Sequence, residues 1–251
     1  MNIQWNPEEY TKNFGFVPNY GEDVLKLINA PPGSYVVDLG CGNGALTQKL
    51  QEMGYRVEGV DDSGDMILCA GKLHPDIKFT HANALTFRLE EKADVVFSNA
   101  VFHWIDEKNQ RKLAENIFRN LKTGGILVCE FGGYGCAETV HSALQESFES
   151  HGLTYPRAFY FPTIGQYASI LEGAGFRVEF AHLFDRPTMQ NTADGAADWI
   201  RMFVKAPFSG MSADLKDEII AEAVEKIRPK LLTGEGWMID YVRIRVKAWR
   251  K

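Results

Sequence analysis

Short apolar stretches and amphipathic stretches alternate along the first half of the chain. The apolar stretches have the length and β-branched content of buried strands, and apolar positions recur at helical spacing in the stretches between them. Such alternation is typical of βαβ units and predicts an α/β domain with a parallel sheet. The predicted strands are residues 34–39, 54–60, 77–80, 93–98 and 125–131, and the predicted helices are 21–30, 45–53, 65–73 and 107–121.

The pattern changes after Phe131, where Gly132, Gly133 and Gly135 predict an irregular exit from the fifth strand. Helices are predicted over 138–150, 163–172, 193–204 and 213–232, and strands over 176–184 and 238–249. In the last strand Arg243, Arg245 and Lys247 alternate with apolar residues. A period of two predicts one apolar and one basic face, and we expect the basic face to be solvated.

Composition and charge narrow the function. Apolar residues make up 45%, enough for a large core, and the net charge of −6 without a basic cluster disfavours a nucleic-acid partner. The N-terminus lacks a signal-peptide pattern, and no apolar run approaches the ~20 residues of a membrane span. The four cysteines form no CxxC pair and the six histidines no HxxxH pair, so we expect reduced thiols, a cytoplasmic location and no metal site.

The strongest local signal is the stretch from Val36 to Gly44, a buried strand followed by a turn with three glycines and then a helix. Glycines at such a turn let a ligand lie against the main chain, and Asp61, 21 residues after Gly40, can accept hydrogen bonds from ribose hydroxyls. The glycines alone fit either a dinucleotide or S-adenosylmethionine (SAM). Asp38, two residues before the turn, would repel a pyrophosphate and attract the ammonium and sulfonium of SAM, and it therefore favours SAM.

Several motifs together resemble the class I SAM-dependent methyltransferases, in particular the trans-aconitate methyltransferase-like (methyltransferase type 11) branch. They are VVDLGCGNG (36–44), GVDDSGDM (59–66), Asn83-Ala84 where the family has Asp-Ala, ADVVFSNAVFHWI (93–105), LKTGGILVCEF (121–131) and WMIDYVRIRVKAW (237–249). The resemblance implies a doubly wound, mostly parallel, seven-stranded Rossmann-like sheet whose last strand is antiparallel. It also implies one domain over 1–251, with an N-terminal segment (1–20) covering SAM and a helical substrate cap within about 134–233.

The resemblance also assigns roles residue by residue. The turn and the strand before it would line the methionine and ribose of SAM, Asp61 would hold the ribose hydroxyls, and later loops would border the adenine and the sulfonium. Asn83 replaces a carboxylate with an uncharged amide, so its bond to the adenine amino group should be weaker. The cofactor-binding residues implied are Asp38, Gly40, Cys41, Gly42, Gly44, Asp61, Asp62, Met66, Asn83, Ala84, Asn99, Ala100 and Tyr10.

The acceptor is expected to be a small molecule, with a carboxylate as one candidate. An ionised carboxylate needs no general base, whereas a hydroxyl or an amine needs one, and His103 is the candidate base. The alternative for His103 is packing or lining the pocket beside Trp104. Trp199, Arg201 and Tyr241 are further candidates for contact with the substrate, with Arg201 suited to an acidic group.

Absent motifs narrow the acceptor further. No Asn-Pro-Pro stretch follows the fourth strand and no Pro-Cys dipeptide occurs, which disfavours methylation of DNA bases. The sequence makes no prediction of the oligomeric state. Two other functions stay open at this stage: an NAD-dependent oxidoreductase and a non-catalytic SAM-binding module.

Overall fold

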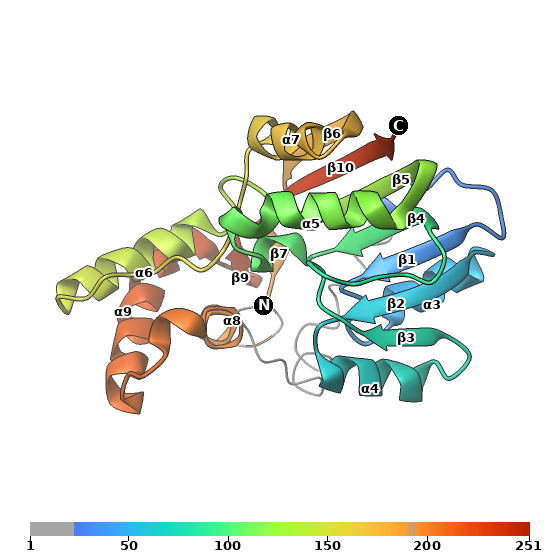
Figure 1. Cartoon of the computed structure of the whole chain (residues 1–251). Helices are drawn as coiled ribbons and strands as arrows, with labels where there is room; N and C mark the ends of the chain where they lie inside the picture. The colour runs from blue at the N-terminus through green and yellow to red at the C-terminus, as the bar shows by residue number, and fades with distance from the viewer. Residues whose placement is uncertain (1–22, 191, 193) are drawn as a thin grey trace.

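A seven-stranded sheet forms the centre of the molecule (Figure 1). The structure is a computed structural model that describes residues 23–190, 192 and 194–251. The strand order is β3-β2-β1-β4-β5-β10-β6, and β10 runs antiparallel to both β5 and β6. The predicted doubly wound sheet with an antiparallel last strand is therefore confirmed. The strands are β1 (Tyr35–Leu39), β2 (Arg56–Asp61), β3 (Lys78–His81), β4 (Ala93–Asn99), β5 (Leu121–Gly132), β6 (Phe176–Asp185) and β10 (Val242–Arg250).

Helices cover both faces of this sheet, which explains why its central strands are apolar on both sides. On one face, α5 (Glu107–Asn120) and α7 (Ile164–Gly173) bury Leu113 and Tyr167 against the strands. On the other face, α3 (Ala45–Glu52) buries Leu50 together with Val24. The helix α4 (Gly64–Leu73) packs against β2 and β3. No helix of the described ranges is both long and apolar enough to cross a membrane.

A second group of elements faces the carboxyl ends of the parallel strands, on the left in Figure 1. It has a core of its own, in which Phe148, Trp199 and Ile220 are buried. The group consists of α6 (Glu138–Ser150), α8 (Gly195–Phe203), α9 (Ala213–Leu231) and a small sheet of β7 (Thr188–Met189), β9 (Gly236–Ile239) and β8 (Leu232–Thr233). The short 3-10 helices η1 (Phe102–Trp104) and η2 (Ala206–Phe208) complete the elements.

Two predicted elements were wrong in extent. The helix expected to reach Ala30 ends at Leu25, since turns precede the Pro31-Pro32 pair and a residue before proline avoids helical geometry. The strand expected over 238–249 is divided into β9 and β10 at Asp240. The Asp240 carbonyl and carboxylate accept hydrogen bonds from the backbone N–H groups of Ala137 and Thr139 at the start of α6, which draws the chain out of the ladder.

The prediction of a solvated basic face on the last strand was also wrong. Arg245 binds the carboxylate of Glu130, which is 2% exposed, and Arg186 binds the same carboxylate. Lys247, whose side chain is 9% exposed, pairs with Glu179. Strands on both sides of β10 supply these acidic partners, so the row of cations lies inside the sheet and not at its edge.

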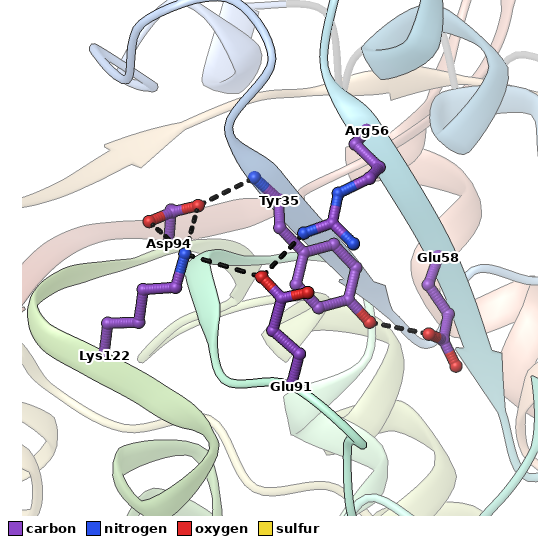
Figure 2. A network of polar contacts seen from close by, with 6 residues as sticks. All are labelled: Tyr35, Arg56, Glu58, Glu91, Asp94 and Lys122. Atoms are coloured by element: carbon purple, nitrogen blue, oxygen red, sulfur yellow. Dashed lines mark hydrogen bonds and ion pairs between the residues drawn. The ribbon is translucent and has the colours of Figure 1, made fainter.

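A network of charged groups links the amino ends of the parallel strands (Figure 2). Asp94 accepts a hydrogen bond of 2.8 Å from the Tyr35 backbone N–H and pairs with Lys122 at 2.9 Å. The Tyr35 hydroxyl donates to Glu58 at 2.6 Å, and Arg56 lies over the Tyr35 ring at 4.3 Å. These polar groups satisfy one another, and the carboxyl ends of the same strands are left as the edge where a ligand is expected.

Candidate functional site

The turn after β1 is shaped by glycine at two positions in particular. Gly40 has φ +82°, and a Cβ atom there would lie 2.2 Å from a methyl carbon of Val101. Gly42 has φ +54°, and no atom lies within 4 Å of where its Cβ would be. Gly40 therefore allows the loop after β4 to approach closely, and Gly42 leaves open space against which a ligand can lie.

The carboxylate of Asp61 ties this turn to the end of β2. One carboxylate oxygen accepts from the Gly42 backbone N–H at 3.0 Å, and the other accepts from the Ser63 N–H at 2.8 Å. Burial raises the pKa of Asp61, while these two backbone bonds oppose the rise. Each oxygen keeps a second lone pair, so the oriented carboxylate can accept from the two hydroxyls of a ribose.

Asp38 lies below the same turn and is 2% exposed. It accepts a hydrogen bond of 2.7 Å from the Thr47 hydroxyl, on the first turns of α3. Burial raises the pKa of Asp38 to about 7, although the Thr47 bond lowers it, and the nearby charge of Asp61 adds to the rise. A positively charged ligand group beside Asp38 would favour its ionised form.

A cavity, here called the Asn83 cavity, lies between the ends of β2, β3 and β4. The Asn83 side-chain oxygen accepts from the Leu85 N–H at 2.9 Å, and its amide nitrogen donates to Asp62 at 3.2 Å. Asn83 is thus fixed in orientation, and its oxygen retains one lone pair for an adenine amino group. The cavity is lined by Asp62, Asn83, Ala84, Leu85, Val101, Trp104, Ile105, Asp106 and Asn109.

The loop after β4 carries Ala100 and His103. Ala100 has φ +60°, a strained value for a residue with a Cβ, and its N–H donates to the Glu130 carbonyl at 2.7 Å. The Gly132 N–H donates to Nδ1 of His103 at 3.1 Å, so the ring proton of the neutral imidazole is on Nε2. Burial, reinforced by the positive charge of Arg243, holds the pKa of His103 well below its usual range.

A second cavity, here called the aromatic cavity, lies between the loop after β4 and the α6/α8/α9 group. The two cavities meet at Trp104, which lines both. The aromatic cavity is lined by Ala100, His103, Trp104, Cys136, Phe159, Phe161, Trp199, Phe203, Tyr241 and Arg243.

The structure brings most of the residues predicted from sequence together at one edge of the sheet. Trp104, Trp199 and Tyr241 line the aromatic cavity, and Trp199 donates its indole N–H to the Tyr241 hydroxyl. Met66 is buried on α4, and its N–H donates to the Ser63 hydroxyl, which caps that helix. The turn residues Gly40, Cys41, Gly42 and Gly44, together with Asn99 at the end of β4, lie at the same edge.

Two predicted residues do not join this group. Arg201 is 45% exposed, lies outside the cavity lining and pairs with Asp198 and Asp217 on the surface. Tyr10, with the rest of the segment 1–20, lies outside the described residues. Arg243 takes the place in the cavity that was predicted for Arg201. The sequence pattern that includes Arg243 is the alternation of basic and apolar residues in the last strand, and we interpreted that pattern as a solvated face.

Comparisons with known proteins agree with this geometry. Residues 37–129 match the family model described as a methyltransferase domain. An uncharacterised methyltransferase of Schizosaccharomyces pombe is 31% identical, covering 98% of both chains. The chain belongs to the class I SAM-dependent methyltransferases. This methyltransferase is also 26% identical to the trans-aconitate 2-methyltransferase of Variovorax paradoxus, over 99% of each chain.

Among solved structures, a putative methyltransferase from Bacillus halodurans shares the fold of this methyltransferase. The TM-score is 0.63 at 18% sequence identity, covering 91% of this chain and 97% of the other. The residues at the turn fit the cofactor of the family. Open space beside Gly42 admits its amino-acid part, the oriented Asp61 carboxylate suits its ribose, and the Asn83 cavity suits its adenine.

The Asp61→Ala variant tests the ribose assignment. Because two ribose hydroxyls lose their acceptor, SAM affinity should fall by roughly 1–3 kcal/mol, which isothermal titration calorimetry measures directly. The matched control is Asp76→Ala, an exposed aspartate in the loop before β3, which should leave the affinity unchanged. Equal affinities of the wild type and Asp61→Ala would remove Asp61 from the cofactor site.

The raised pKa of Asp38 predicts a pH dependence of cofactor binding. Below about pH 7 the Asp38 carboxyl is protonated and no longer attracts the cofactor ammonium. One pH unit below a pKa, only about a tenth of the group is ionised. The affinity for S-adenosylhomocysteine should therefore rise on the order of tenfold from pH 5.5 to 7.5. Titration calorimetry at intervals over this pH range measures the rise. Asp38→Asn should bind more weakly with a flatter profile, and an equally steep profile in that variant would exclude Asp38 as the cause.

Proposed function

We propose that this methyltransferase transfers the methyl group of SAM to a carboxylate of a small molecule held in the aromatic cavity. One observation carries the proposal. Arg243 lines that cavity, and its interaction among the described residues is with the Tyr241 ring, 4.6 Å away, without an acidic partner. Its neighbours Arg245 and Lys247 on the same strand both have acidic partners. A guanidinium in a largely apolar cavity is well suited to bind a carboxylate.

The arrangement of the two cavities supports this acceptor position. The Asn83 cavity and the open space at Gly42 would hold the adenine and amino-acid ends of the cofactor. Trp104 lines both cavities and Ala100 lines the aromatic cavity, so the sulfonium would lie beside these two residues. An acceptor bound by Arg243 would then approach the methyl group from the side opposite the sulfur, as an in-line displacement requires.

For this reaction the protein mainly has to bind the cofactor and the acceptor and to align them. SAM supplies a methyl group activated by its sulfonium charge. The acceptor carboxylate oxygen forms the new bond to that carbon while the carbon–sulfur bond breaks and its electron pair goes to sulfur. A methyl ester and S-adenosylhomocysteine result, and no proton moves.

His103 is better suited to positioning than to acting as a base. Its Nδ1 accepts the Gly132 N–H, and its low pKa keeps the ring neutral with the proton on Nε2. The Nε2–H group can donate a hydrogen bond to an acceptor oxygen but cannot remove a proton. A cavity whose described lining residues offer no available base favours an acceptor that is already ionised.

The α6/α8/α9 group would act as the cap of this site. Trp199 and Phe203 of α8 form one wall of the aromatic cavity, and exclusion of water there strengthens the attraction between Arg243 and a carboxylate. The Variovorax paradoxus relative is named a trans-aconitate 2-methyltransferase, which supports a small acidic acceptor. An NAD-dependent oxidation is not favoured, given the family.

A methyl-label assay tests the proposal. Incubation with SAM labelled in its methyl group and a mixture of carboxylic acids should give label that mild alkali releases as volatile methanol, because methyl esters hydrolyse readily. Arg243→Gln should lower kcat/KM for the acceptor roughly 10–100-fold, since hydrogen bonds to a charged group contribute about 1.5–3 kcal/mol. The affinity for SAM should stay unchanged.

Arg201→Gln is the matched control, because it removes an exposed arginine that pairs on the surface. Its kcat/KM should equal that of the wild type. Alkali-stable label would instead indicate methylation of nitrogen or carbon. SAM binding without S-adenosylhomocysteine formation across the acids would favour a non-catalytic binding module.

A further inference from the structure

The lining of the aromatic cavity is informative about the body of the acceptor. Five aromatic side chains from three separate segments meet there: Trp104, Phe159, Phe161, Trp199 and Phe203. The rings of Phe159 and Phe161 are stacked with an interplanar angle of 7°, and Trp104 lies 4.8 Å from Phe159. These packed rings give the cavity an apolar lining on which a planar group can stack. This lining favours a planar, apolar body over one that carries many polar groups.

The charges around the cavity indicate how many carboxylates the acceptor carries. Arg243 is the one cation among its lining residues in the described part of the chain, and His103 is neutral. Arg245 and Arg186 are both engaged with Glu130. One guanidinium can bind one carboxylate bidentately.

A second carboxylate on the same acceptor would find no second cation among the described lining residues. The faces of the aromatic rings carry partial negative charge, and a buried anion without a hydrogen-bonding cation is strongly disfavoured. Burial raises the pKa of the Cys136 thiol, so this lining side chain stays neutral. The cavity therefore discriminates against acceptors with two or three carboxylates.

Resting on the carboxylate methylation proposed above, we infer that the acceptor is a monocarboxylic acid with a flat, apolar body, such as an aromatic or unsaturated acid. Arg243 binds the carboxylate and the five rings enclose the body. The reaction is the ester formation already written, in which the carboxylate oxygen gains the methyl group and the sulfur gains the electron pair. The inference separates this protein from relatives named for trans-aconitate, which carries three carboxylates.

A matched pair of acids tests the inference on the full chain. Cinnamate and 4-carboxycinnamate share one planar skeleton and differ by a single carboxylate at the far end. Production of S-adenosylhomocysteine should give a kcat/KM at least tenfold higher for cinnamate, and trans-aconitate should react as poorly as the dicarboxylate. Benzoate and trans-2-decenoate extend the set of monocarboxylates in case the body is shorter or longer than that of cinnamate.

A variant that adds a cation to the cavity provides the second measurement. Phe203→Arg should raise the ratio of kcat/KM for 4-carboxycinnamate over cinnamate about tenfold, while Phe203→Leu should lower both values and leave the ratio unchanged. Binding of S-adenosylhomocysteine by each variant confirms that the fold is intact. Should Phe203→Arg not fold, the wild-type comparison of the matched acids decides alone.

The possible outcomes separate the two proposals. Equal or better turnover of trans-aconitate and 4-carboxycinnamate would overturn the monocarboxylate inference and leave carboxylate methylation standing. No turnover of any acid, with S-adenosylhomocysteine still bound, would overturn both the inference and the proposed carboxylate chemistry.

Discussion

The bond between the Asp61 carboxylate and the Gly42 N–H is the interaction on which the cofactor site depends. It joins the turn after the first strand to the end of the second, and the Ser63 N–H holds the other oxygen. The carboxylate is thereby oriented before a ligand arrives. Gly40 adds the close approach of Val101, which brings the loop after β4, and with it His103, to the same edge of the sheet.

Paired and unpaired charges along β10 determine the acceptor side of the site. Arg245 and Lys247 lie within the sheet because Glu130 and Glu179 on the neighbouring strands neutralise them. Arg243, at the start of the same row, lies beyond these acidic residues and reaches the aromatic cavity. A strand that completes the sheet thus also supplies the cation we assign to the acceptor.

Local patterns predicted the strands of the sheet well. The apolar runs, the glycines of the first turn and Asp61 are contiguous signals, and the seven-stranded sheet with an antiparallel last strand followed from the family resemblance. The elements from β1 to α7 lie within a few residues of the predicted bounds. Asp240 could not be assigned from the sequence, because its role in starting α6 depends on a contact across about a hundred residues.

The acceptor side was predicted less completely for the same reason. Trp199 and Tyr241 were candidates and do line the cavity, but Arg201 points to surface carboxylates and Arg243 takes its place. Phe159 and Phe161 lie in a segment without helix or strand, where periodicity carries no signal. Which face of a strand is solvated depends on its neighbours in the sheet, and the period of two alone does not reveal them.

A crystal structure of the complex with S-adenosylhomocysteine tests the central claim most directly. We expect both ribose hydroxyls on the Asp61 carboxylate, the amino-acid part against Gly42 and the sulfur beside Ala100, facing the aromatic cavity. A complex in which the ligand lies elsewhere, or with its ribose directed away from Asp61, would contradict it.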